Sequence, residues 1–242
     1  VTCCDKNLPM NGAESLLRSL VNSGVDTCFA NPGTSEMHFV AALDRVNGMR
    51  AVLGLFEGVV TGMGDGYARM AEKPPVTLLH LGPGLANGLA NLHNARRASS
   101  PIVNVVGDHA TYHAQYDAPL ASDIVGFARP VSAWVHSSTS ALTVGADAAR
   151  AVQVARQAPG QIATLILPAD VAWLEANSAA EALPVVEASR VADSTISDIA
   201  QTLRTAQSTG ARVAILMRGA PLRGEGLQAA GKIAAATGAR LL

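Results

Sequence analysis

A strand, a turn, a helix and a second strand follow one another in residues 76–108, which read VTLLHLGPGLANGLANLHNARRASSPIVNVVGD. The expected elements are a strand over 76–81, a turn at Gly82-Pro83-Gly84, a helix over 85–97 and a strand over 102–106. Pro101 introduces the second strand, and Gly107-Asp108 ends it. Apolar strands and a helix joined by such short glycine and proline junctions are typical of a parallel βαβ unit.

The same alternation continues on both sides of this stretch. Further strands are expected at 25–30, 51–56, 131–135 and 162–167, and further helices at 12–23, 35–43, 57–71 and 141–157. Hydrophobic residues make up 49% of the 242 residues and aromatic residues only 4%. That composition suits helices packed on a buried parallel sheet. The pattern therefore predicts an α/β fold with a doubly wound, mostly parallel sheet.

The pattern is interrupted once, between residues 173 and 192, by a segment rich in Ala, Glu, Ser and Pro. It resumes with a helix at 194–206, a strand at 212–217, a helix at 222–236 and a strand from about 239. One such unit is too small to bury both faces of a sheet. We therefore expect a first domain over residues 1–172, a linker over 173–192, and an incomplete, truncated second α/β domain over 193–242.

Charge, hydropathy and cysteine content exclude several classes of protein. The net charge of -1 gives no basic face for a nucleic acid. No apolar run approaches the roughly 20 residues that span a membrane, and no signal-peptide core is found, so a cytoplasmic protein is expected. Cys3, Cys4 and Cys28 form neither a disulfide framework nor a metal-ligand spacing, so we predict no metal site in this chain.

Glu57 is a carboxyl group at the end of an expected strand, inside an apolar run from Ala51 to Val60. Desolvation in such a place raises the pKa of a carboxyl group, which can then exchange a proton with a ring nitrogen held at hydrogen-bond distance. The alternative is that Glu57 lies in the first turn of a helix and only interacts with the helix dipole.

The junction after the third expected strand holds His80 and the glycines Gly82, Gly84 and Gly88. These glycines allow a ligand to approach the backbone at a helix N-terminus, and with Asp108 they resemble a weak dinucleotide fingerprint. The alternative is a tight turn with no ligand. His80 is either a hydrogen-bonded core histidine or a proton shuttle at a site that opens at the strand end.

Two other groups of residues allow more than one interpretation. Thr34 follows Pro32-Gly33 and is a candidate N-cap for the next helix. His109 and His113 lie in a polar loop, and two histidines without a third ligand favour exposed loop residues over a metal site.

Taken together, three segments resemble the acetolactate synthase and benzoylformate decarboxylase family of thiamine-diphosphate enzymes. They are Asn31-Pro32-Gly33-Thr34, the stretch from Leu55 to Arg69, and Gly82-Pro83-Gly84-Leu85-Ala86-Asn87. Residues 11–170 resemble the family's N-terminal pyrimidine-binding domain, and the chain after about 190 resembles the start of its central domain. His80 and Thr34 stand where benzoylformate decarboxylase has a histidine and a serine near the substrate.

The resemblance implies a decarboxylase or carboligase of 2-oxo acids that uses thiamine diphosphate and magnesium. By similarity, Glu57 hydrogen-bonds the aminopyrimidine ring of the cofactor, which acts as an electron sink. The implied catalytic residues are Glu57, His80 and Thr34, and the implied cofactor contacts are Asn31, Pro32, Gly33, Glu57, Gly82, Gly84 and Asn87. The implied assembly is a homodimer or tetramer.

This chain departs from the family in two respects. The family's diphosphate and magnesium segment, a Gly-Asp-Gly…Asn pattern in a C-terminal domain, has no counterpart here, so we expect an N-terminal part that is inactive alone. The loop from Gly107 to Asp117 is shorter and richer in histidine, so the resemblance assigns no particular 2-oxo acid. The alternatives are a nicotinamide-dependent oxidoreductase built on the Gly82 to Gly88 turn, and a non-catalytic regulatory subunit.

Overall fold

The computed structural model describes residues 9–186 and 188–242. The chain forms two compact units, Val1–Val186 and Glu187–Leu242. Cys3 and Cys4 lie outside the described residues, whereas Cys28 is a free thiol in the core of the first unit, where burial raises its pKa to about 12. A thiol with that pKa is not ionised near neutral pH and has no part in the chemistry discussed below.

The first unit is built on a six-stranded parallel sheet with the order β2-β1-β3-β4-β6-β5. The strands are β1 (Thr27–Asn31), β2 (Arg50–Leu53), β3 (Val76–Leu79), β4 (Ile102–Asp108), β5 (Trp134–Ser137) and β6 (Ile162–Pro168). The predicted α/β fold with a doubly wound, mostly parallel sheet is therefore confirmed.

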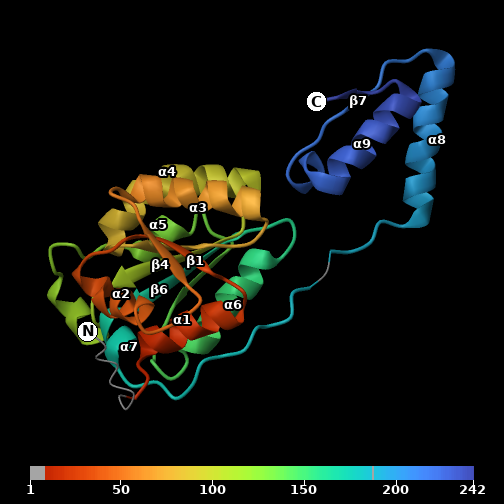
Figure 1. Cartoon of the computed structure of the whole chain (residues 1–242). Helices are drawn as coiled ribbons and strands as arrows, with labels where there is room; N and C mark the ends of the chain where they lie inside the picture. Colours follow the sequence, from red (N-terminus) through yellow and green to blue (C-terminus); the bar gives the residue numbers. More distant parts are fainter. Residues whose placement is uncertain (1–8, 187) are drawn as a thin grey trace. The chain divides into compact units, whose positions relative to one another are not determined.

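Helices cover both faces of this sheet (Figure 1). One face carries α1 (Gly12–Asn22), α2 (Met37–Leu43), α6 (Val144–Arg156) and α7 (Ala169–Trp173). The other carries α3 (Glu57–Ala71), α4 (Leu81–Ala98) and α5 (Ile124–Ala128). Two short 3-10 helices, η1 (Thr34–Glu36) and η2 (Thr111–Tyr116), follow β1 and β4.

The hydrophobic core is divided in two by the sheet, because successive side chains of a strand point to opposite faces. In β4, Val103 and Val105 belong to the core under α1 and α6, whereas Ile102 and Val106 belong to the core under α3 and α4. Each such fully buried aliphatic side chain contributes about 1.5–3 kcal/mol relative to an exposed one. These two cores fix the positions of the strand ends that carry the polar residues.

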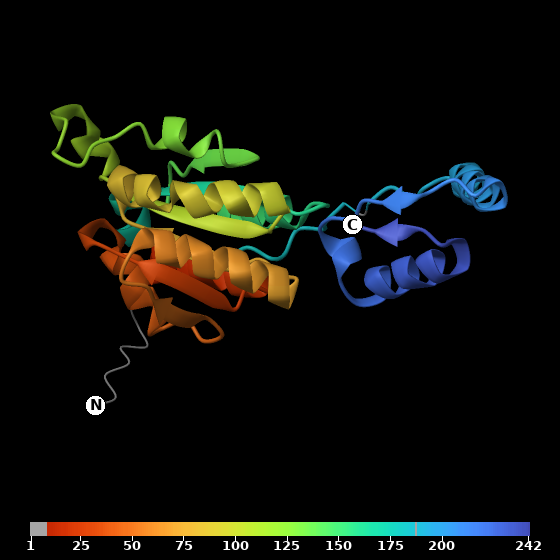
Figure 2. The same ribbon diagram turned by 90° about the horizontal axis from the view of Figure 1, so that it is seen from above.

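The strand order reverses between β1 and β3. From β1 the chain moves outward to β2, and it then returns across the sheet through α3 to place β3 on the other side of β1. In open α/β sheets, ligands bind outside the carboxyl ends of the strands at such a switch point. Figure 2 shows α3 and α4, the two helices that flank this point, running side by side.

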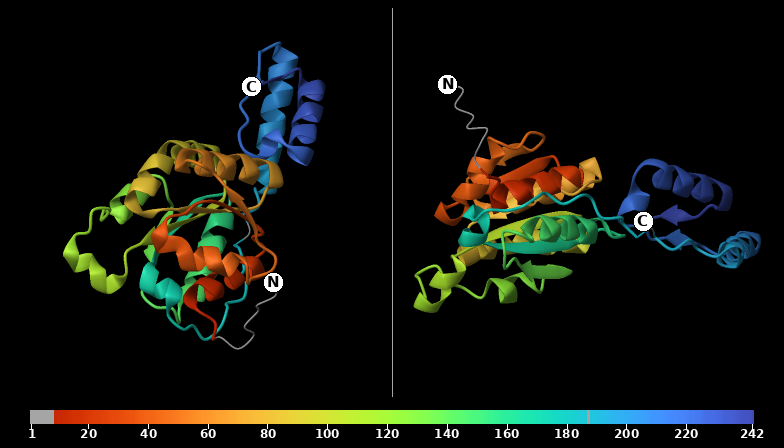
Figure 3. Two further views of the ribbon diagram at one scale, coloured as in Figure 1. Left: turned by 60° about the vertical axis from the view of Figure 1, so that its left-hand side comes forward. Right: turned by 90° about the horizontal axis from the view of Figure 1, so that it is seen from below.

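The segment after α7 is held against the first unit over part of its length. Glu175 forms a bridge with Asn11, the N–H of Ala180 donates to Ser19 Oγ at 2.8 Å, and Gln153 donates to the carbonyl of Pro184. Figure 3 shows α1 and α6, the two helices that it contacts, lying next to each other. The predicted linker boundaries, 173–192, stay a prediction.

The second unit contains α8 (Asp193–Thr209), β7 (Ala214–Ile215), η3 (Ala220–Leu222), α9 (Gly224–Thr237) and β8 (Arg240–Leu241). Its two short strands pair in parallel. Several of its large apolar side chains are exposed, among them Ile196, Ile199 and Leu216. Among the described residues of both units, no helix combines the length and apolar character that a membrane crossing requires.

Candidate active site

Most of the residues singled out from the sequence lie at the carboxyl edge of the sheet. Gly33 and Thr34 follow β1, Glu57 follows β2 and begins α3, and His80 follows β3. Because all strands are parallel, their carboxyl ends meet at one edge. The switch point between β1 and β3 therefore lies between Gly33 and His80.

Glu57 is the first residue of α3, where the helix dipole stabilises a negative charge. Its Oε2 accepts a hydrogen bond of 3.0 Å from Asn87 Nδ2, and no hydrogen bond to Oε1 is found within the described residues. A Cβ atom placed on Gly84 would lie 3.2 Å from this Oε1. One carboxylate oxygen is thus fixed by Asn87, and the other faces a glycine that leaves room beside it.

The apolar setting expected for Glu57 is not formed by the described residues. The side chain is only partly buried, and its neighbours Leu55, Phe56 and Val59 are 89%, 49% and 51% exposed. The expectation assumed that β2 extends to Phe56, but β2 ends at Leu53. Asn31 Nδ2 donates to the carbonyl of Gly54 at 2.8 Å, just beyond that end. Leu55, Phe56 and Val59 therefore reach the surface.

His80 is held by a carboxylate that the sequence did not reveal as a site residue, Glu36. His80 Nδ1 lies 2.7 Å from Glu36 Oε2, and the same oxygen accepts the backbone N–H of Gly33 at 2.7 Å. Glu36 is 1% exposed. Burial raises the pKa of its carboxyl group, although the bonds from Gly33 and His80 oppose this rise. One signal was available: Gly33 and Glu36 have the spacing of a capping box.

Gly33 is required by the position of the His80 ring. A Cβ atom on Gly33 would lie 2.3 Å from His80 Nδ1 and 2.6 Å from Cγ, so the imidazole rests directly on the glycine. On the other side, a Cβ atom on Gly84 would lie 3.5 Å from His80 Cβ. Gly84 therefore contacts both His80 and Glu57, which places these two residues next to each other at the switch point.

The remaining predicted site residues are less closely involved. Thr34 is exposed and begins η1, for which Gly33 is the N-cap, so the candidate N-cap role of Thr34 is wrong. Pro32 and Asn31 are partly buried, and Asn31 ties the ends of β1 and β2 together. The structure thus brings together Glu57, His80, Gly33, Gly84 and Asn87, and leaves Thr34 at the same edge without a hydrogen bond to them.

The predicted turn at Gly82-Pro83-Gly84 is part of α4. The chain turns one residue earlier, at Leu81, which has a left-handed backbone with φ of 54°. Pro83 is then accommodated in the first helical turn, where its missing N–H has no helical partner. Cβ atoms on Gly82 and Gly88 would lie 2.2 Å from Ser122 and 2.8 Å from Thr61. The space beside these two glycines is thus occupied by Ser122 and Thr61, and no open cradle for a phosphate group remains there.

The loop after β4 carries the two histidines noted in the sequence. The rings of His109 and His113 are 5.8 Å apart, and that of His113 is 5.3 Å from Tyr116. Thr111 anchors the loop by donating its N–H to Asp170 at 3.0 Å. Burial raises the pKa of Asp108 at the start of the loop. In the part of the chain that the structure describes, no cluster of three His, Cys, Asp or Glu side chains could hold a metal ion.

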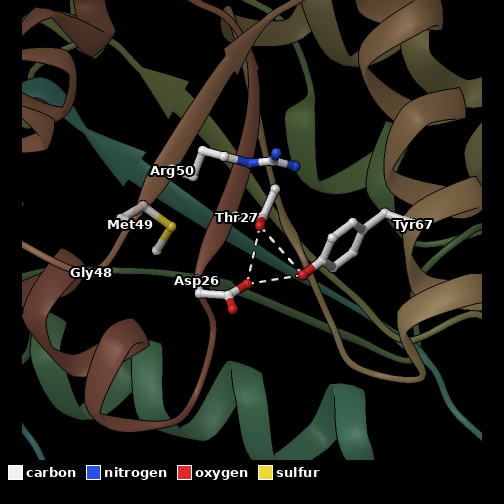
Figure 4. Close-up of a pocket in the computed structure, with 6 residues that line it drawn as sticks. All are labelled: Asp26, Thr27, Gly48, Met49, Arg50 and Tyr67. Carbon is white, nitrogen blue, oxygen red and sulfur yellow. Dashed lines mark hydrogen bonds between the residues drawn. The ribbon is translucent and has the colours of Figure 1, made fainter.

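An open pocket of about 500 Å³ lies at the opposite, amino edge of the sheet, between β1, β2 and α3 (Figure 4). Asp26 accepts hydrogen bonds from Thr27 at 3.0 Å and Tyr67 at 2.9 Å, and it pairs with Lys73. The backbone N–H of Arg50 donates to the Asp26 carbonyl at 2.8 Å, whereas its guanidinium has no partner among the residues described. Because the other polar groups already bind one another, this pocket is a self-contained surface network and not the candidate active site.

Comparison with known proteins is consistent with this geometry. Residues 10–127 match the family model "Thiamine pyrophosphate enzyme, N-terminal TPP binding domain". The chain is 57% identical over 233 residues to a provisionally named acetolactate synthase large subunit, IlvX, of Mycobacterium tuberculosis, covering 96% of this chain and 44% of that protein. It is 34% identical over 148 residues to benzoylformate decarboxylase of Pseudomonas aeruginosa, covering 61% of this chain and 28% of the relative.

A solved structure of a known enzyme has a similar fold. The thiamine diphosphate-dependent 4-hydroxybenzoylformate decarboxylase of Rhodococcus jostii superposes with a TM-score of 0.75 at 26% sequence identity. The match covers 86% of this chain and 39% of the decarboxylase. The chain thus spans less than half the length of each of these three proteins.

Proposed function

The chain belongs to the thiamine pyrophosphate enzymes of the acetolactate synthase and benzoylformate decarboxylase type, and we propose that its first domain, residues 1–172, forms the pyrimidine side of a cofactor site in a 2-oxo-acid decarboxylase. Residues 193–242 belong, on this proposal, to the family's central domain. The observation that carries the proposal is the Glu57 carboxyl group, which has one oxygen held by Asn87 and the other, beside Gly84, without a hydrogen bond to any described residue.

The residues present fit the pyrimidine half of thiamine diphosphate. A ring nitrogen needs one carboxyl oxygen within hydrogen-bond distance and space for a flat ring beside it. Glu57 Oε1 provides the first, and the missing side chain of Gly84 contributes to the second. When bound, the cofactor supplies an electron sink for the carbanion left by decarboxylation. Its diphosphate and magnesium would be held by residues outside these 242, since the one Gly-Asp-Gly run here, Gly64-Asp65-Gly66, lies inside α3 with Asp65 paired to Arg69.

On this proposal, Glu57 holds a proton at Oε1 and shares it with the pyrimidine ring. The bond from Asn87 keeps Oε2 occupied, so that exchange is directed to one oxygen. The N-terminus of α3 supports the charge of Glu57 after the proton has left. On this proposal Glu57 would be a catalytic residue, because it would touch the cofactor directly.

His80 is proposed as the group that moves a proton to or from the substrate. It adjoins Glu57 across Gly84, and its ring has an open edge, since its side chain is 22% exposed. A positioned imidazole suits protonation of a carbanion near neutral pH, which yields an aldehyde. This favours decarboxylation over carboligation. Thr34, exposed at the same edge, is proposed to help position the substrate.

The surface beside Glu57 is proposed to be covered by a second copy of the chain. Leu53, Leu55, Phe56 and Val59 are large apolar residues exposed in a single segment next to the site. Permanent subunit interfaces are more apolar than ordinary surfaces. A homodimer or tetramer would bury this segment and exclude water from Glu57. Sedimentation of the wild-type protein against Leu55→Glu is expected to show a shift towards the monomer, and an unchanged assembly would contradict this part of the proposal.

The proposal is tested on the complete gene product with magnesium and thiamine diphosphate. Benzoylformate, 4-hydroxybenzoylformate and pyruvate serve as aromatic and aliphatic probes. Glu57→Gln keeps the shape of the side chain but removes its exchangeable proton, and we expect turnover to fall by about 10²–10⁴-fold. Glu72→Gln, at the other end of α3, is the matched control and should leave turnover unchanged.

Two results would reject this function. Wild-type turnover that persists in Glu57→Gln would remove the role of the carboxyl group. Turnover that depends on a nicotinamide cofactor and not on thiamine diphosphate would favour the oxidoreductase alternative, while a folded, complete protein without any cofactor-dependent turnover would indicate a regulatory subunit.

A further inference from the structure

Glu36 is a buried acid in a place where burial is costly. Its side chain is 1% exposed, and both of its polar contacts, to the Gly33 N–H and to His80 Nδ1, use the single oxygen Oε2. The other oxygen, Oε1, is buried without a hydrogen-bond partner in the described residues. Leaving such an atom unpaired in the interior is destabilising. The helix cap alone does not explain this cost, because a serine or asparagine cap can be made at the surface.

Two glycines, Gly107 in β4 and Gly33 after the end of β1, make room for this acid and its histidine. A Cβ atom on Gly107, in β4, would lie 1.6 Å from Glu36 Oε1 and 2.5 Å from its Cδ. A Cβ atom on Gly33, after β1, would overlap the His80 ring. The carboxyl group and the imidazole thus occupy a slot whose walls are glycine backbone. Neither group can move far without breaking the Glu36–His80 contact.

The contact determines which ring nitrogen of His80 exchanges protons. Nδ1 is occupied by Glu36, whereas Nε2 makes no hydrogen bond with the residues described and is not sealed from solvent. When the pair holds one proton between the two groups, that proton lies on Nδ1 and faces Glu36. When a second proton is added, it enters and leaves through Nε2, whichever of the two groups carries the first.

We propose that Glu36 is a positioning residue for His80, which holds the imidazole proton at Nδ1 and thereby presents Nε2 to the substrate as the proton-exchanging atom. This role rests on the proposed decarboxylation, in which His80 protonates the carbanion. Glu36 itself does not touch substrate or cofactor. Gly33 and Gly107 take part by leaving the space that the pair needs.

The first test reads the tautomer directly and does not depend on activity. In the 242-residue chain labelled with 15N-histidine, long-range proton–nitrogen spectra at alkaline pH distinguish a protonated Nδ1 from a protonated Nε2. We expect His80 to carry its proton on Nδ1 in the wild-type chain and on Nε2, the nitrogen that free imidazole prefers, in Glu36→Met. Glu36→Gln retains an acceptor oxygen and should keep the proton on Nδ1.

A matched control is available in the same fold. His136 Nε2 lies 3.3 Å from Asp147 Oδ1, which makes a second histidine–carboxylate pair, but a more exposed one on the outer strand β5, three positions from β3 in the sheet. Asp147→Asn should leave the His80 signals unchanged. A His80 proton that stays on Nδ1 in Glu36→Met, or that is found on Nε2 in the wild-type chain, would overturn the proposal.

The second test measures turnover by the complete gene product. Glu36→Met should lower kcat by roughly 10²–10⁴-fold, the usual range for loss of a general acid or base, with a much smaller change in KM. Glu36→Gln should restore part of this loss, because it keeps the tautomer but not the charge. Circular dichroism of both variants establishes that they fold, and Glu36→Gln keeps the test decisive if the Met variant does not.

The proposed decarboxylation and the positioning role of Glu36 would be rejected by different results. If the wild-type protein has no thiamine-dependent turnover, the proposed function fails, but the spectra still decide whether Glu36 fixes the tautomer. If the wild-type protein turns over and Glu36→Met does so equally fast, the function stands and the positioning role is rejected.

Discussion

The two edges of the sheet treat their polar residues in opposite ways. At the amino edge, Asp26 binds the hydroxyl groups of Thr27 and Tyr67 and pairs with Lys73, in the open and close to water. At the carboxyl edge, Glu36 is buried with one oxygen unpaired, and Glu57 has one oxygen free beside a glycine. A buried polar group that is left unsatisfied requires an explanation, and a role in catalysis is one of those that occur.

This contrast also explains why the open pocket at the amino edge is not the site. Apart from the Arg50 guanidinium, its polar groups bind one another, so a ligand at Asp26, Thr27 or Tyr67 would have to displace internal hydrogen bonds. The carboxyl edge instead presents two carboxylate oxygens, Glu36 Oε1 and Glu57 Oε1, that have no hydrogen-bond partner among the described residues. These unpaired oxygens identify the candidate site better than the open pocket does.

The largest effect on turnover and stability is expected from filling the space that Gly107 leaves for the Glu36 carboxyl group at the carboxyl edge. Gly107→Ala places a methyl group 1.6 Å from the present position of Glu36 Oε1, so the carboxyl group must leave His80 or the strand must shift. We expect turnover to fall by a factor similar to that in Glu36→Met, and the free energy of unfolding to fall by about 1–3 kcal/mol, as for other overpacked sites. Turnover and urea unfolding measure the two effects.

Gly66→Ala is the control for this substitution. Gly66 lies within α3, and a Cβ atom there would meet nothing within 4 Å. The change should leave turnover intact and stabilise the helix by about 0.5–1 kcal/mol. Equal turnover in Gly107→Ala and the wild-type protein would show that the slot is wider than the Glu36 contacts indicate.

Much of the fold was predictable from local patterns. The helix from Glu57 to Ala71 has the predicted bounds, because Lys73-Pro74-Pro75 stops it and the strand before it is apolar. The parallel sheet followed from the strand and helix alternation. The short helices α5 and α7 were not predicted, since five residues are too few to show a helical period.

The site was predictable only where its residues are neighbours in sequence. Glu57, His80 and Gly84 stand at strand and helix ends that the pattern marks. The burial of Glu36 could not be predicted from the sequence, because it depends on the distant residue Gly107. Glu36 follows β1 and Gly107 lies in β4, and these two strands come close only because they pair with β3 from opposite sides. Likewise, Leu81 takes the left-handed conformation that would ordinarily be assigned to a glycine beside it.

A second, smaller effect concerns pH, where the two edges should respond with opposite signs. Hydrogen bonding and pairing with Lys73 lower the pKa of Asp26 below its ordinary value of 3.8, so its stabilising contribution is present above that pH and is lost as pH falls through the lowered pKa. Burial raises the pKa of Glu36 above 4.5, so its contribution is fully present below 4.5 and is lost as pH rises through the raised pKa.

Denaturant unfolding between pH 3 and pH 8 can separate these signs. Relative to the wild-type protein, Glu36→Gln should gain stability as pH rises above 4.5, because the variant has no buried carboxyl group to ionise. Asp26→Asn should instead lose relative stability from acidic to neutral pH, by a small amount, since Asp26 is close to solvent. Parallel pH profiles for both variants would show that the two edges do not differ in this respect.

The smallest effect is expected at the end of α3, the helix that connects the two edges. Glu57 begins this helix, where the dipole favours a negative charge, whereas Glu72 follows its last residue, where the dipole opposes one. Glu72 also has a left-handed backbone, with φ of 55°, which a glycine adopts without strain. Glu72→Gly should therefore stabilise the protein by up to about 1 kcal/mol, or a few degrees in Tm. Glu72→Gln removes only the charge, so any further gain in Glu72→Gly measures the backbone strain. If Glu72→Gly is no more stable than Glu72→Gln, the left-handed conformation costs nothing at this position. Turnover should be unchanged in both variants, because Glu72 lies at the edge of the sheet that takes no part in the proposed reaction.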